Sequence, residues 1–156
     1  MTMKITVKDI QQAHGRISPY IHRTPILESR ALNKIIGCEL LFKAENFQKI
    51  GAFKARGACN AVFSMDEPSL QKGVITHSSG NHGAALAWAA ALRDVSCTVV
   101  MPENAPSVKI AAVKGYGATI ELCQPNMAAR EGTVASLIEQ HGYTLVHPYD
   151  EDVIIA

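Results

Sequence analysis

The chain has 156 residues, of which 47% are hydrophobic and 19% are charged, a composition typical of one compact domain with its own core, or of one domain and a fraction. Fifteen basic and fourteen acidic residues leave a formal charge of +1 without runs of like charge, so we expect no nucleic-acid partner and favour a small neutral or zwitterionic one. No apolar stretch is long enough to span a bilayer and Met1–Lys8 has no signal-peptide core, so we expect no membrane partner and a cytoplasmic location.

The cysteines and histidines show no pattern of a metal or redox site. The four cysteines are Cys38, Cys59, Cys97 and Cys123, and none forms a CxxC pair. We expect reduced thiols in the core of a cytosolic protein. We also expect no metal site, because His14, His22 and His141 lack the spacing of a ligand pair.

The first 65 residues predict three helices and a strand. A capping-box pattern at Thr6 favours a helix over Val7–Ile17, and prolines at positions 19 and 25 then favour an extended connector. Ser29 is suited to cap a short helix that ends at Gly37. The further expectations here are burial of Leu32, Ile35 and Ile36, a strand over Glu39–Ala44, a helix over Phe53–Met65 and a linker over Asp66–Lys72.

From Gly73 onward, strand candidates alternate with helical stretches rich in alanine, leucine and valine. The strands are expected over Gly73–His77, Cys97–Met101, Ala118–Leu122 and Thr144–His147, and the helices over Asn81–Arg93, Ser107–Tyr116 and Met127–His141. This alternation indicates a parallel sheet. We therefore predict an α/β fold with an open twisted parallel sheet and helices on both faces.

The segment Gly51–Ala58 places a lysine, Lys54, at a predicted helix start between small and aromatic residues. The partial positive charge of a helix N-terminus and desolvation both disfavour an ammonium group there. A free amine can form a Schiff base with an aldehyde cofactor and then move a proton. Lys54 is therefore a candidate catalytic residue, although a solvated charge at a helix end is the alternative.

A second segment, Thr76–Gly83, connects a predicted strand to an alanine-rich helix. Its glycines allow the backbone to approach a ligand closely, and the first free N–H groups of a helix form an anion site. Serine hydroxyls and the amide of Asn81 add groups that can bind a carboxylate and a polar ring substituent. A capped turn whose glycines serve packing is the alternative interpretation.

Both segments together, in this order and spacing, resemble the fold-type II pyridoxal-phosphate enzymes, specifically the serine/threonine dehydratase and serine racemase family. Further matching segments are Phe42–Gln48, Pro102–Lys109, Tyr116–Ala118, Arg130-Glu131 and His147-Pro148. The resemblance implies a tryptophan synthase beta-like fold of which this chain is the N-terminal half. Residues 1–65 would be an incomplete part of the large domain, residues 66–150 a small α/β domain and residues 151–156 the start of the return to the large domain.

The resemblance also implies the roles of individual residues. Lys54 would hold pyridoxal 5′-phosphate as a Schiff base and act as acid and base, Phe53 would pack near the cofactor ring, and Asn81 would bind the ring hydroxyl. The residues expected to bind the substrate carboxylate are Ser78, Ser79, Gly80, Asn81 and His82. In a racemase, Ser79 would be the second acid and base.

The implied activity is that of a lyase or an isomerase of amino-acid metabolism: α,β-elimination from, or racemisation of, a small hydroxy amino acid. We expect a homo-oligomer, such as a dimer, or a missing C-terminal half, since the phosphate-binding loop of relatives lies beyond Ala156. Two alternatives stay open. One is a non-catalytic truncated paralogue or interaction module that binds an amino acid or a full-length relative. The other is a nucleotide-binding domain, disfavoured because Ser79–Gly83 lacks a GxGxxG series.

Overall fold

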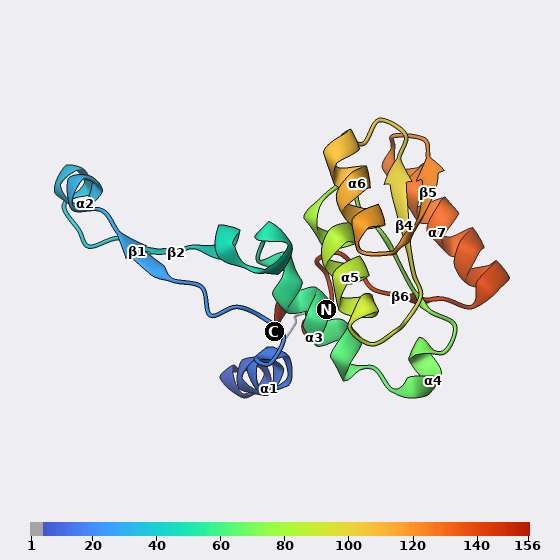
Figure 1. Ribbon diagram of the computed structural model, residues 1–156, viewed down its shortest axis with the longest axis horizontal. Helices are drawn as coiled ribbons and strands as arrows, with labels where there is room; N and C mark the ends of the chain where they lie inside the picture. Colours follow the sequence, from blue (N-terminus) through green and yellow to red (C-terminus); the bar gives the residue numbers. More distant parts are fainter. Residues whose placement is uncertain (1–4) are drawn as a thin grey trace.

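The centre of the molecule is a four-stranded parallel sheet in the order β5-β4-β3-β6. The computed structural model describes residues 5–156, so Met1–Lys4, half of the stretch in which no signal-peptide core is expected, lie outside the described residues. The strands are β3 (Val74–His77), β4 (Cys97–Pro102), β5 (Thr119–Cys123) and β6 (Thr144–Leu145). Helices α5 (Asn81–Ala91) and α6 (Ser107–Gly115) cover one face and α7 (Met127–His141) covers the other (Figure 1).

Successive side chains of a strand point to opposite faces of the sheet, and helices bury both faces. Val74 and Val99 pack in the cluster that contains α5. Their neighbours Ile75 and Val100 pack with Val134 of α7. All four strand residues are fully buried, as expected for central strands of a parallel sheet with helices on both faces. The predicted fold class is confirmed.

Helix α5 lies in the middle of the body and is buried on nearly every side. Small alanine side chains let it approach both the sheet and α3 (Lys54–Ser64). Its Trp88 is 9% exposed, in agreement with a core position. Helices α1 (Val7–Ile17) and α8 (Asp152–Ile155) also pack on α3. Helix α3 therefore joins the N-terminal part of the chain to the sheet domain.

An arm extends from this body (Figure 1). It consists of β1 (Ile26–Glu28), α2 (Arg30–Ile36) and β2 (Leu41–Lys43), and the two strands pair antiparallel. The predicted cap at Ser29 is present, and Gly37 has the left-handed conformation, with a φ of 79°. The expected burial is wrong, because the arm points away from the sheet. Its exposed apolar side chains include Leu32, Ile35 and Ile36, and Cys38 is exposed too, contrary to the prediction of four core thiols.

The remaining differences from the predicted elements are small. The expected linker Asp66–Lys72 contains a short helix, α4 (Glu67–Leu70), which Asp66 caps through Ser69 N. Strand β1 was not predicted, and β6 is shorter than Thr144–His147. The division into two domains at residue 65 stays a prediction. Helix α3, which precedes this residue, packs against α5, which follows it.

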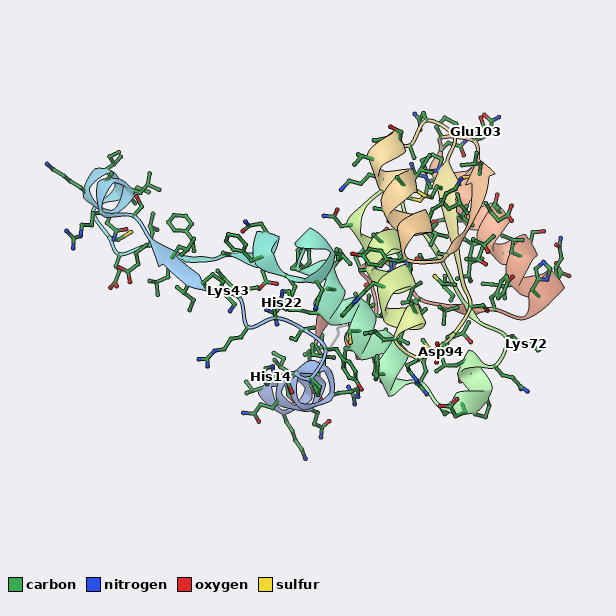
Figure 2. The ribbon with its side chains drawn as sticks, viewed as in Figure 1. His14, His22, Lys43, Lys72, Asp94 and Glu103 are labelled. Carbon is green, nitrogen blue, oxygen red and sulfur yellow. The ribbon has the colours of Figure 1, made fainter. Side chains whose placement is uncertain are left out.

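Within residues 5–156, no helix is long and apolar enough to cross a membrane. The same part of the chain contains no group of three or more histidine, cysteine or acidic side chains placed to hold a metal ion. His14 lies on α1, whereas His22 lies in the segment that leads into the arm (Figure 2).

Candidate active site

Helices α3 and α5 run side by side in the same direction, so their first residues lie at the same end. Arg93, which follows α5, donates hydrogen bonds to the carbonyl oxygens of Val62 and Met65 at the end of α3, at 2.9 and 3.1 Å. At the opposite end, the 3-10 helix η2 (Lys49–Gly51), which precedes α3, contacts α5. The packing thus brings Lys54 and Asn81, the first residues of the two helices, to one end of the pair.

Lys54 is partly buried at this end. Its Nζ donates a hydrogen bond to the carbonyl oxygen of Pro148 at 2.6 Å and lies 5.3 Å from the ring centroid of Phe53. Burial lowers the pKa of Lys54, because the charged form loses hydration. Phe53 itself is 59% exposed. The amine is therefore easier to deprotonate than that of a fully exposed lysine, as predicted.

The turn before α5 offers hydroxyl and N–H groups beside the helix start. Ser78 Oγ accepts a hydrogen bond from the backbone N–H of Gly80 at 3.2 Å, whereas Ser79 is exposed. No side chain in the described part of the chain caps α5, so the N–H groups of its first turn are available to an anion. Asn81 Oδ1 accepts a hydrogen bond from Lys109 Nζ at 2.7 Å.

His82, the second residue of α5, is buried, with 4% of its surface exposed. Its Nε2 lies 3.4 Å from the carbonyl oxygen of Val146, and its Nδ1 has no hydrogen-bond partner among residues 5–156. The pKa of His82 is lowered to about 4, chiefly by burial; the hydrogen bond with Val146 opposes this shift, and the charges of Lys54, His147 and His77 add to it. The imidazole is therefore neutral at neutral pH.

This pKa predicts an acid-sensitive stability. An unfolded chain binds a proton at His82 near pH 6.5, whereas the folded chain binds it only near pH 4. Between these values the unfolded state holds more protons, so the free energy of unfolding falls as the pH drops. At about 1.4 kcal/mol per pKa unit, the loss between pH 7 and pH 4.5 is roughly 2 kcal/mol. Urea unfolding at pH 7 and pH 4.5 should show a smaller loss of the free energy of unfolding in His82→Gln than in the original chain.

The exposed control His141→Gln should leave this loss unchanged. Equal losses in all three proteins would contradict the assignment of the effect to His82.

One segment after β6 contacts both parts of the site. The carbonyl oxygen of Val146 faces His82, and that of Pro148 accepts the hydrogen bond of Lys54. In the sequence, His147-Pro148 is one of the segments that match the family, but it carries no predicted role. Its contact with Lys54 joins residues 94 positions apart, which only the sheet topology brings together.

A cavity of about 440 Å³ opens next to Lys54. It is lined by residues of α1, the start of α3 and the C-terminal segment, among them Phe53, Lys54, Gly57, Tyr149 and Ile154. The turn Ser78–Gly83 does not line it. The structure therefore connects that turn to Lys54 through helix packing and the segment after β6, and not through this cavity.

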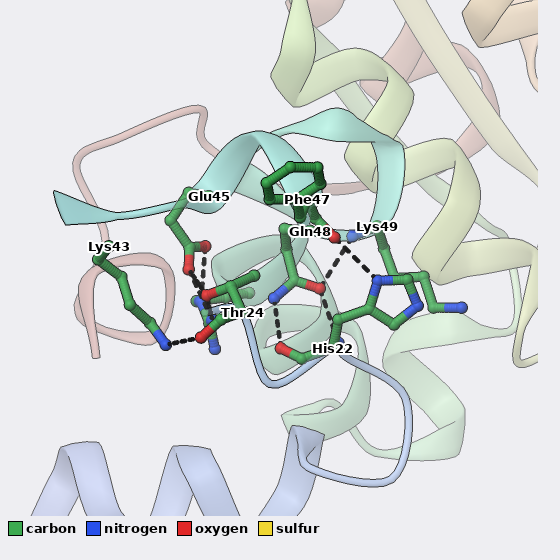
Figure 3. Close-up of polar contacts among 8 residues, drawn as sticks. His22, Thr24, Lys43, Glu45, Phe47, Gln48 and Lys49 are labelled. Carbon is green, nitrogen blue, oxygen red and sulfur yellow. Dashed lines mark hydrogen bonds and ion pairs between the residues drawn. The ribbon is translucent and has the colours of Figure 1, made fainter. Parts of the chain in front are cut away.

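A polar cluster at the base of the arm fixes the first turn of α3. Glu45 accepts two hydrogen bonds from the Arg56 guanidinium, at 2.9 and 2.8 Å, and one from Thr24 Oγ1 at 2.6 Å. The hydrogen bond with Arg56 is the main cause that lowers the pKa of Glu45. Nearby, the buried Gln48 side chain pairs with both backbone groups of His22 at 2.8 Å (Figure 3). Arg56 lies two residues after Lys54, so the cluster holds the turn that carries the amine.

Comparisons with known proteins agree over most of the chain. A family model described as pyridoxal-phosphate dependent enzyme matches residues 17–156. The chain is 56% identical over 152 residues to serine racemase of Dictyostelium discoideum, covering 97% of this chain and 47% of that protein. It is 50% identical over 151 residues to beta-hydroxyaspartate dehydratase of Paracoccus denitrificans, covering 97% and 48%. The structure of maize serine racemase superposes with a TM-score of 0.95 at 42% identity, covering 98% of this chain and 46% of that one. The chain thus spans about half the length of these relatives.

Proposed function

We propose, from the premise that this chain belongs to the family of pyridoxal-phosphate dependent enzymes, that it is the lysine-bearing N-terminal half of a fold-type II enzyme. That enzyme eliminates the hydroxyl and amino groups of a small hydroxy amino acid or racemises it. The observation that carries the proposal is the position of Lys54, a partly buried amine of lowered pKa at the same end of the helix pair as Asn81. The names of the two relatives, a serine racemase and a beta-hydroxyaspartate dehydratase, agree with such chemistry.

The residues present fit pyridoxal phosphate by their chemistry. Lys54 offers a primary amine to the aldehyde, and the exposed ring of Phe53 lies beside that amine. Lys109 donates to Asn81 Oδ1, so the amide Nδ2 is the group of Asn81 that would donate a hydrogen bond to a ring oxygen. When bound, the cofactor draws electrons from the α-carbon of an amino acid and makes its proton acidic.

The remaining roles follow from the chemistry of the turn. The uncapped first turn of α5 binds the substrate carboxylate through its N–H groups, with the hydroxyl of Ser78 beside it. Lys54 removes the α proton on one face and holds it on Nζ. In racemisation, Ser79 delivers a proton to the other face. In elimination, the bond between the β-carbon and its hydroxyl oxygen breaks instead, and the hydroxyl leaves as water with the proton held on Lys54 Nζ, so Ser79 need not act as a donor.

The test compares two products of L-serine. In the enzyme supplied with pyridoxal phosphate, Ser79→Ala is expected to reduce D-serine formation by about 10²-fold or more, because a general acid is lost. Pyruvate formation should fall much less. Chiral chromatography measures D-serine, and coupled lactate dehydrogenase measures pyruvate. The control Ser78→Ala should leave the ratio of the products unchanged. Equal losses of both products in Ser79→Ala would contradict its role as the second acid.

We also propose that the arm is covered in a homo-oligomer, which its exposed Ile35 and Ile36 support, since apolar surfaces of this kind favour association. A stable monomer in analytical ultracentrifugation would contradict this. A cytoplasmic location is proposed as well. Its support is the four free thiols, which are typical of reducing compartments.

A further inference from the structure

His147 closes a tight loop immediately after the last strand. Its ring Nδ1 accepts hydrogen bonds from the backbone N–H groups of Tyr149 at 3.3 Å and Asp150 at 2.9 Å. Its own backbone N–H donates to Glu151 Oε1 at 3.3 Å. The ring also packs edge-on against Tyr149, with the centroids 4.6 Å apart, and against His77 at 6.1 Å. A side-chain acceptor for N–H groups two and three residues onward fixes a turn in the way asparagine and aspartate do.

Pro148 lies within this loop and presents its carbonyl oxygen to Lys54 Nζ at 2.6 Å. Proline has a fixed φ and no N–H of its own, so the direction of its carbonyl group depends on the turn around it. We propose that His147 is a positioning residue: by accepting the two backbone hydrogen bonds it orients the Pro148 carbonyl oxygen, which in turn fixes Lys54 Nζ. The catalytic meaning rests on the proposed function of Lys54, whereas the contacts themselves do not.

The acceptor atom, and not the ring, carries this role. Asparagine Oδ1 is the same number of bonds from Cα as histidine Nδ1, so His147→Asn keeps an acceptor at this place. Leucine has the same branched shape as asparagine but no acceptor. In His147→Leu, the two N–H groups lose their partner, the loop opens and water reaches Lys54. Burial lowers the pKa of this lysine, so its pKa should rise when the loop opens.

The experiment measures the apparent pKa of Lys54 by competitive acetylation with acetic anhydride over a pH series. A model peptide serves as the reference, and tryptic peptides are quantified by mass spectrometry. In the original chain and in His147→Asn, Lys54 should titrate below the lysine of the model peptide. In His147→Leu its apparent pKa should rise to that of the model peptide. The control His141→Leu, at the exposed end of α7, should leave Lys54 unchanged.

Circular dichroism establishes that each variant is folded. If His147→Leu does not fold, His147→Gln replaces it, because its acceptor lies one bond farther out and misses the two N–H groups. The inference is overturned if Lys54 titrates alike in all folded variants, or if His147→Asn behaves as His147→Leu does. Acetylation needs no cofactor. A chain that binds no pyridoxal phosphate at Lys54 yet shows the asparagine and leucine difference would therefore refute the proposed function alone.

Discussion

Alanine in place of Lys54 is expected to abolish the covalent attachment of pyridoxal phosphate after borohydride reduction. The reagent fixes a pyridoxyl group only on a nitrogen that has reacted with the aldehyde. Lys54 is favoured for that reaction because burial lowers its pKa and increases the free amine at neutral pH. In an assay of the enzyme with cofactor, loss of this acid and base should reduce the rate by about 10³-fold. Mass spectrometry of intact protein and tryptic peptides gives the extent and site of labelling.

Two further variants serve as controls. One tests whether labelling needs the amine of Lys54 or only its positive charge, and the other tests whether labelling is specific to this lysine. Lys54→Arg keeps a cation that can donate to Pro148 but has no nucleophilic amine, so it should remain unlabelled as Lys54→Ala does. Lys34→Ala, on the exposed arm, should be labelled as fully as the original chain. Labelling that is spread evenly over lysines in the original chain, or that persists in Lys54→Ala, would rule out Lys54 as the site of attachment.

Helix bounds were predictable because the signals that set them lie within a few residues. Helix α1 begins after the Thr6 capping box, as predicted, with Thr6 N donating to Asp9 Oδ2 at 2.8 Å. Helix α7 has the predicted bounds, Met127–His141, and ends at Gly142 in the left-handed conformation. The alternation of strands and helices was sufficient to predict a parallel sheet, since neighbouring parallel strands need crossover connections between them.

Burial of the arm could not be predicted in the same way. The spacing of Leu32, Ile35 and Ile36 indicates that they share a face of α2, but not which surface covers that face. The arm lies away from the sheet, and these side chains are exposed. Periodicity is a local property, whereas burial depends on where the rest of the chain lies.

The candidate site was predictable in part. Lys54 and the turn Ser78–Gly83 stand out in the sequence because each combines small residues with reactive groups at a helix start. The contacts that join them do not stand out. Pro148 and His147 lie more than 60 residues beyond the turn, and their position depends on the pairing of β6 with β3. The only indication in the sequence was that His147-Pro148 matches the family. That match marks the segment but does not predict its contact with Lys54.

The second large effect is expected from Gly57→Ala, at the end of the first turn of the helix that carries Lys54. A Cβ atom at this position would overlap the backbone carbonyl oxygen of Ile154 and lie 3.2 Å from the carbonyl carbon and 3.3 Å from Cα of that residue. Backbone atoms cannot rotate away as a side chain can, so α8 must move off α3. Overpacking of this kind should lower the free energy of unfolding by about 2 kcal/mol. Displacement of α8 should also open the cavity beside Lys54 and raise the pKa of its amine by hydration.

A matched control separates the clash from the ordinary effect of alanine in a helix. Gly132 lies within α7, and a Cβ atom there would meet no atom of residues 5–156 within 4 Å. Gly132→Ala should therefore raise the free energy of unfolding by about 0.5–1 kcal/mol, because alanine loses less backbone entropy than glycine. Urea unfolding followed by circular dichroism measures both variants. Opposite signs are expected, and a Gly57→Ala protein as stable as Gly132→Ala would show that α8 does not lie against α3 in solution.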